Sequence, residues 1–192
     1  MQAPTQRLAQ MARRWRACRS GVAALEFALV APILILIFFG VVESADALAR
    51  NRQVTLAVNT LVDLASQETQ LLTSDVDDLF DGVEQIINDD DAPLTIRLVS
   101  VVNDPDGKPI VHWSRNNSGG EPYVKGASFT TLPATTLIDP GSSILVAEIS
   151  YAYSSKISQL VIPPIDFESA ATRWPRRSMR VQLCTSANSC TS

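Results

Sequence analysis

The sequence contains little of the chemistry from which active sites are built. His112 is the only histidine among 192 residues, and aromatic residues make up 6% of the chain. It has no Gly-x-Ser-x-Gly sequence, no phosphate-binding loop and no metal-ligand spacing. The acidic run at 88–91 lacks the spacing of a calcium loop, so we interpret it as solvated. We therefore expect a protein that is not an enzyme and that binds no cofactor or metal, with His112 in a structural role.

Charge is distributed unevenly along the chain, whose net charge is −4. Residues 1–21 contain five arginines and no acid, so the remainder holds 11 basic and 20 acidic residues. Basic residues beside a first apolar helix stay in the cytoplasm. We therefore predict that residues 1–21 are a basic cytoplasmic leader and that the acidic remainder lies across the membrane, in the periplasm. An acidic domain does not attract phosphate backbones, so we expect no nucleic acid as a partner.

Charged residues are nearly absent from residues 22–42, where Glu26 is the only one. A helix rises 1.5 Å per residue, so about 20 apolar residues cross a hydrocarbon core of about 30 Å. The segment is therefore long enough to be a transmembrane helix. Pro32 lies within it and lacks a backbone donor, which predicts a kink. A charge inside a membrane is costly, so Glu26 is a candidate functional residue.

Glycine and proline are missing between Gly40 and Gly82. This absence predicts one long helix over residues 22–72, with an apolar stripe on its second half that consists of Val54, Val58, Leu61 and Ala65. We expect the stripe to cover the sheet that follows. A second, short amphipathic helix is predicted over 75–88, with Ser74 as its N-cap and acids in its first turn.

From residue 94 onward the pattern is that of β-strands. The predicted strands are 94–102, 110–114, 144–153 and 177–184, the last of which should bury Met179, Val181 and Leu183. Residues 115–143 are predicted to be a long loop with a short strand near 128–131, and 162–165 a stiff crossing segment that contains two prolines. The chain is therefore predicted to be α+β. Residues 73–192 should form a domain with a three- or four-stranded, mostly antiparallel sheet under the long helix.

The residues around Glu26 form a motif. Gly21 follows the basic leader, Glu26 comes five residues later, and Phe27 is next. A Gly-x-x-x-x-Glu-Phe sequence at the head of an apolar helix resembles the processing site of type IV pilin-like precursors. With Pro32 and Glu43 in the expected order, residues 19–65 are similar to the TadE/TadG-like pseudopilins of Tad (Flp) pili. Pilin-like proteins share the general layout predicted above.

The resemblance implies a function. A prepilin peptidase would cleave between Gly21 and Val22, and Glu26 would register one subunit against its neighbour during assembly. The protein would be a minor pilin or pseudopilin needed to assemble a Tad (Flp) type IVb pilus in adherence and biofilm formation. Its partners would be the peptidase, the other Tad pilins, the assembly machinery and the inner membrane, which it would cross once with its N-terminus in the cytoplasm.

Three alternatives remain open at this stage. Glu26 would lie simply at the headgroup level if the helix dipole alone stabilised it. The chain would be a permanently anchored extracytoplasmic binding module if it never entered a filament. It would be a secreted domain if Ala45-Asp46-Ala47 were a signal-peptide cleavage site, although the apolar run exceeds the usual 7–15 residues.

Cysteine usage agrees with export. Cys18 lies in the leader, whereas Cys184 and Cys190 form an even pair in the part expected in an oxidising compartment. This favours a disulfide that closes a small loop. Two unpaired thiols near the C-terminus are the alternative.

Overall fold

The computed structural model describes residues 20–87, 93–132, 138–139, 141–155, 164–186 and 189–191. The predicted leader up to residue 19, which includes Cys18, lies outside these residues, as do the acidic run at 88–91 and residues 162–163 of the predicted crossing segment. By its internal contacts the chain divides into two compact units, Met1–Ala45 and Asp46–Ser192.

The described elements are two helices and seven strands. In chain order they are α2 (Ser20–Gln67), β1 (Gln70–Leu72), α3 (Thr73–Ile87), β2 (Leu94–Asn103), β3 (Pro109–Asn116), β4 (Ser143–Tyr153), β5 (Ile165–Arg173), β6 (Gln182–Ser186) and β7 (Ser189–Cys190). Strands β3-β2-β4-β5 form a fully antiparallel sheet in that order. A smaller sheet has the order β1-β6-β7, in which β1 and β6 run parallel. The predicted α+β class, with a long helix on a mostly antiparallel sheet, is confirmed.

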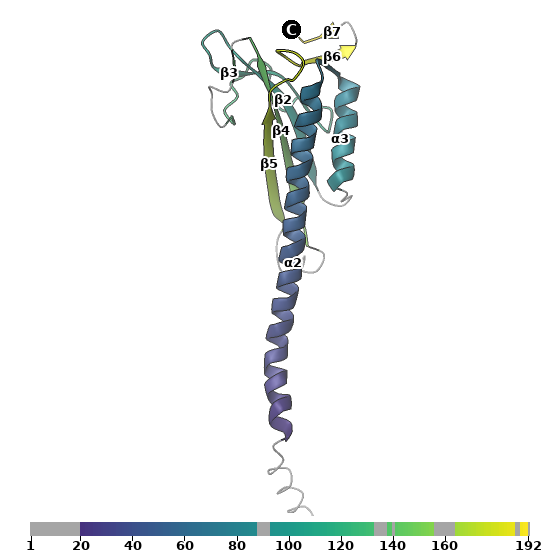
Figure 1. Cartoon of the computed structure of the whole chain (residues 1–192), viewed down its shortest axis with the longest axis vertical. Helices are drawn as coiled ribbons and strands as arrows, with labels where there is room; N and C mark the ends of the chain where they lie inside the picture. Colours follow the sequence, from purple (N-terminus) through teal and green to yellow (C-terminus); the bar gives the residue numbers. More distant parts are fainter. Residues whose placement is uncertain are drawn as a thin grey trace, which may run out of the picture. The chain divides into compact units, whose positions relative to one another are not determined.

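The core of the unit Asp46–Ser192 joins both helices to one face of the four-stranded sheet. All four residues of the predicted α2 stripe are buried, with relative exposures of 0–1%. They pack in one cluster with α3, through Val76, Phe80, Val83 and Ile87, and with the face of β4 that carries Leu145, Ala147, Ile149, Tyr151 and Tyr153. Figure 1 shows α3 beside the second half of α2, with β5 on the other side of α2. The buried residues of the helices therefore follow the helix period of 3.6 residues, and those of the strands follow the strand period of two residues.

The opposite face of the sheet is covered at one end by the chain between β3 and β4. Phe129 and Ile138 are buried against Val99, Val111 and Val146 in a second apolar cluster. The backbone N–H of Phe129 donates to the Pro109 carbonyl at 2.9 Å. In place of the predicted short strand at 128–131, the structure has an isolated bridge between Ile110 and Ser128. The described part of this loop is therefore packed on the sheet.

The structure corrects two helix boundaries. α2 ends at Gln67 rather than at residue 72, because residues 70–72 pair with β6 and the Leu71 side chain is buried. α3 begins at Thr73, so Ser74 is not its N-cap. The Asp75 carboxylate instead accepts a hydrogen bond from the Leu72 N–H at 2.9 Å and satisfies one donor of the first turn.

The structure also corrects the C-terminal strands. β5 was missed entirely, because its sequence is rich in acids and alanine, but it pairs with β4 from residue 145 to 153. The last predicted strand begins at Gln182 rather than at 177, and Met179 is 64% exposed instead of buried. The Met179 carbonyl accepts a hydrogen bond from the Ser143 N–H at 2.8 Å, which holds this segment beside the start of β4.

Two leucines of α2 test the assignment of the buried stripe. Leu61 is 1% exposed and Leu56 is 62% exposed. Leu61→Ala leaves a cavity in the core and should lower the free energy of unfolding by about 2–5 kcal/mol. The same substitution at Leu56 should change it by less than about 0.5 kcal/mol. Urea unfolding of the full chain in detergent micelles, followed by tryptophan fluorescence, measures both; equal losses would contradict the assignment.

Candidate functional site

The motif residues all lie in the first half of α2, where side chains are exposed. Val22 is 54% and Phe27 70% exposed, and Gly21 and Glu26 are exposed as well. None of the described residues hydrogen-bonds to or forms an ion pair with the Glu26 carboxylate. The large apolar residues from 22 to 42 are exposed throughout, a pattern that water does not favour.

α2 is apolar and long enough to cross a membrane, as judged by its length and composition, and it is the one such helix among the described residues. Pro32 lies inside this helix, which continues on both sides of it. The exposed apolar surface and the length together are consistent with a single membrane anchor.

Gly21 is not required by the structure of this chain. It has no positive φ angle, because it lies in α2. A Cβ atom added to Gly21 would meet no heavy atom within 4 Å. In an exposed helix, glycine is less stable than alanine by about 1 kcal/mol. The fold therefore gives no reason for glycine at this position.

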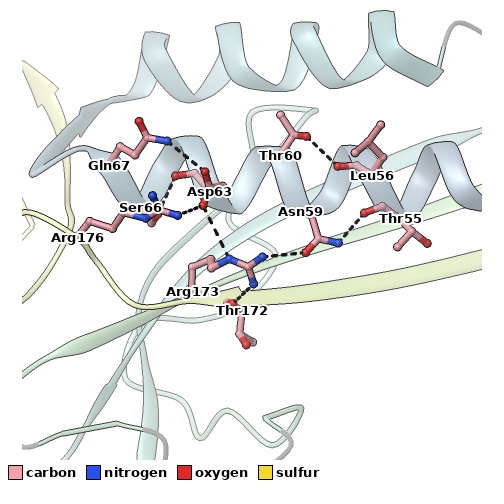
Figure 2. A network of polar contacts seen from close by, with 10 residues as sticks. All are labelled: Thr55, Leu56, Asn59, Thr60, Asp63, Ser66, Gln67, Thr172, Arg173 and Arg176. Atoms are coloured by element: carbon pink, nitrogen blue, oxygen red, sulfur yellow. Dashed lines mark hydrogen bonds and ion pairs between the residues drawn. The ribbon is translucent and has the colours of Figure 1, made fainter.

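The second half of α2 is tied to the C-terminal part of the chain by a polar network (Figure 2). Asp63 accepts hydrogen bonds from Arg176 Nη2 and from Gln67 Nε2, the latter at 3.2 Å, and its carboxylate lies 3.9 Å from Arg173 Nε. Arg173 Nη2 also donates to Asn59 Oδ1 at 3.2 Å. The backbone N–H of Arg176 donates to the Ser66 carbonyl at 2.8 Å. These contacts provide partners for the last turns of α2, which has no basic residue in its last turn.

Sequence reasoning did not find the two arginines of this network. A signal was present, because no acid occurs after Glu168 whereas four arginines lie between 173 and 180. A basic stretch within an acidic domain indicates acidic partners elsewhere in the structure. Only the fold shows that one of these partners is Asp63, which lies more than 100 residues earlier.

Two other polar pairs fix the elements around the sheet. Arg115 on β3 donates two hydrogen bonds to Asp77 on α3, at 2.8 and 2.7 Å. These bonds lower the pKa of the Asp77 carboxyl and raise that of the Arg115 guanidinium. On the outer face, the Tyr123 hydroxyl donates to Glu148 at 2.7 Å beside Arg97, inside an open depression of about 330 Å³. Burial, more than the Glu148 hydrogen bond, raises the Tyr123 pKa.

Cys184 and Cys190 are joined by a disulfide that links β6 to β7. Among the described residues, no three His, Cys, Asp or Glu side chains gather where they could hold a metal ion. The candidate site that the motif residues define is the exposed apolar half of α2.

Comparison with known proteins finds a family resemblance in the first half of α2 and the turns that follow it. Residues 21–62 match the family model of TadE-like proteins, and the match begins at Gly21. Residues 21–62, about a fifth of the chain, thus form a TadE-like domain, and the match does not extend to residues 63–192. No curated protein and no solved structure matches the chain.

His112 is the buried titratable group of the domain that is most perturbed. It is 5% exposed, its Nδ1 lies 3.4 Å from Ser100 Oγ, and no described residue hydrogen-bonds to its Nε2. Burial, helped by the positive charges of Lys125 and Arg180, lowers the pKa of His112 to about 4. The imidazole is therefore neutral at physiological pH, in keeping with a structural role.

This shift makes stability depend on pH. The folded-state pKa of His112 is lowered, so between pH 6.5 and about 4 the unfolded chain binds a proton that the folded chain does not. Stability is present above pH 6.5 and should fall by up to about 3 kcal/mol as the pH drops through this window. Urea unfolding of the wild type and of His112→Asn at several pH values measures this; the variant should lack this part of the slope. Parallel curves would contradict the assignment.

Proposed function

We propose that the protein is a minor pilin, or pseudopilin, of a Tad (Flp) type IVb pilus, needed for pilus assembly in adherence and biofilm formation. It is made as a membrane precursor, and a prepilin peptidase cleaves it between Gly21 and Val22. Its partners are that peptidase, the other Tad pilins and the assembly machinery in the inner membrane. The observation that carries the proposal is the TadE-like match, which begins at Gly21 and includes the exposed apolar half of α2.

The environment of Gly21 supports cleavage at this position. Neither packing nor backbone conformation requires glycine here, so the requirement has to come from outside the chain. A peptidase cleft that admits extended backbone and no side chain is such a requirement. Glycine also lowers the cost of unwinding the start of α2, which a peptidase needs in order to reach the bond.

Cleavage would give Glu26 a partner. The new α-amino group on Val22 is mostly cationic at neutral pH. An ammonium at the start of a helix, from the same chain or from a neighbouring one, offsets the burial of the Glu26 carboxylate in an apolar bundle. Glu26 therefore registers one subunit against the next in this proposal.

The distribution of charge supports the orientation. The five arginines of residues 1–21 hold the leader in the cytoplasm, and the acidic domain crosses to the periplasm. The chain is then a single-pass protein with a leader at 1–21, a transmembrane segment at about 22–42 and a periplasmic domain at 73–192. The second half of α2 is part of that domain's core.

The structure favours this route over a signal peptide cut after Ala47. Asp46 accepts a hydrogen bond from the Tyr153 hydroxyl at 2.8 Å, and Ala47 packs against the main core. A cut after Ala47 would remove both contacts. It would also have to occur within α2, which is continuous through these residues.

Two exposed glycines of α2 test the cleavage. Gly21 and Gly40 are both helical, and neither would place an added Cβ near another atom. Gly21→Val should abolish processing by a co-expressed prepilin peptidase, whereas Gly40→Val should leave it intact. N-terminal sequencing and intact mass of the membrane-extracted protein measure both, and the processed chain should begin at Val22. A chain that still begins at Met1 beside an active peptidase would overturn the proposal, as would one that begins at Leu48.

Glu26 is tested after cleavage. The Glu26→Ala variant should still be cleaved, but it should form fewer surface pili. The reduction should be at least about tenfold, because the loss of one desolvated ion pair costs over about 1.4 kcal/mol. Asp81→Ala removes an exposed acid of α3 and serves as the control. Counting pili by electron microscopy in complemented deletion strains measures this, and wild-type piliation with Glu26→Ala would remove the registry role.

A further inference from the structure

An acidic groove lies between the end of α2 and the start of α3. Its cavity volume is about 520 Å³, and it is lined by Leu64, Gln67, Glu68, Leu71, Asp75, Asp78 and Leu79. The three leucines form an apolar floor, and Leu64 is 45% exposed although it belongs to the folded domain. The three carboxylates lie around this floor.

For two of these carboxylates, the described part of the chain provides no cation. Asp75 is engaged with the Leu72 N–H as the helix cap. No described residue forms an ion pair with Glu68 or Asp78, and α3 contains no lysine or arginine. A ligand of this groove would therefore combine an apolar side chain with flanking positive charges.

The same domain presents such a segment. Met179 is 64% exposed and lies in the basic segment 176–180, between Arg177 and Arg180. The segment is held in place by the Ser143 N–H, which donates to the Met179 carbonyl, and by Arg180 Nε, which donates to the Gly141 carbonyl at 2.9 Å. It is thus ordered before any partner binds, which reduces the entropic cost of docking.

The basic segment contributes no residue to the lining of the groove, although Gln67 of that lining donates to Asp63, which also binds Arg176. Arg176 contacts Asp63 and the Ser66 carbonyl from the side of β5, whereas the groove opens between α2 and α3. Figures 1 and 2 both show α3 on one side of α2 and the β5 side on the other. The basic segment of a chain therefore does not fill that chain's own groove.

We propose that the basic segment of one copy docks into the acidic groove of a second copy. Met179 would enter the apolar floor, where an unbranched thioether adapts to an irregular surface. Arg177 and Arg180 would lie against Glu68 and Asp78, the two carboxylates with which no described residue of their own chain forms an ion pair. Opposite charge and matching apolar surface on one domain are the observations that select a second copy as the occupant.

The contact is heterologous, because two different surfaces meet. Each copy that uses its groove still has a free basic segment, so association continues in a row rather than closing as a dimer. The groove is small, so the contact is weak in solution and gains from confinement in a membrane, where local concentration is high. The inference rests on the unit Asp46–Ser192 alone and does not depend on cleavage at Gly21.

Charge reversal tests the docking on the uncleaved full chain. The chain is kept in excess detergent micelles, and its association constant is measured by sedimentation velocity over a range of protein concentrations. Arg177→Glu and Asp78→Arg should each raise the dissociation constant by about tenfold or more. The double variant, which exchanges the two charges, should return to within about threefold of the wild type. Added salt should weaken association of the wild type.

Matched controls separate docking from folding. Asp81→Arg on α3 and Arg52→Glu on α2 reverse exposed charges outside the groove and the segment, and both should associate like the wild type. Circular dichroism checks that every variant is folded. A wild type that stays monomeric overturns the proposal, even if an added basic peptide binds, because a different protein would then occupy the groove. The proposal is also overturned if the single charge reversals do not weaken association, or if the double variant does not restore it.

Discussion

The burial of one apolar stripe of α2 against the sheet is the interaction on which the rest of the structure depends. From Val54 to Ala65 the stripe packs with α3 and β4 and leaves the polar residues of the same turns outside. From residue 22 to 42, α2 is apolar on every side apart from Glu26, and its large apolar side chains are exposed. The second half of α2 thus buries its apolar side chains in a protein core. The exposed apolar side chains of the first half are suited to another apolar medium, such as a lipid bilayer.

Arginines from distant parts of the sequence donate hydrogen bonds to carbonyls near the C-terminal ends of both helices. α3 has no basic residue in its last turn, and Arg50 of α2 donates to the Ile87 carbonyl at its end, at 3.1 Å. At the end of α2, the Arg176 N–H donates to the Ser66 carbonyl, and the Arg176 side chain binds Asp63. Donors at helix C-termini satisfy free carbonyls and oppose the helix dipole, so these contacts stabilise the ends of both helices. The TadE-like match ends at residue 62, so it includes Asn59 of this network but not Asp63.

Sequence prediction succeeded where a pattern is local and periodic. The α2 stripe was predicted from the helix period and is buried, and the buried residues of α3 and β4 follow the helix and strand periods in the same way. It failed where pairing overrides local preference. β5 carries Asp166 and Glu168 in a strand that its sequence does not favour, and it forms because β4 offers a full edge. Residues 70–72 continue the helical composition of α2 but pair with β6 instead.

The sequence by itself determined the apolar helix, the motif from Gly21 to Phe27 and the α+β class, because each depends on neighbouring residues and on a fixed repeat. Only the tertiary structure decided which polar groups meet. Asp63 with Arg173 and Arg176, and Asp77 with Arg115, join residues far apart in the chain. No periodicity encodes such pairs, since their geometry is set by how the helices and strands pack.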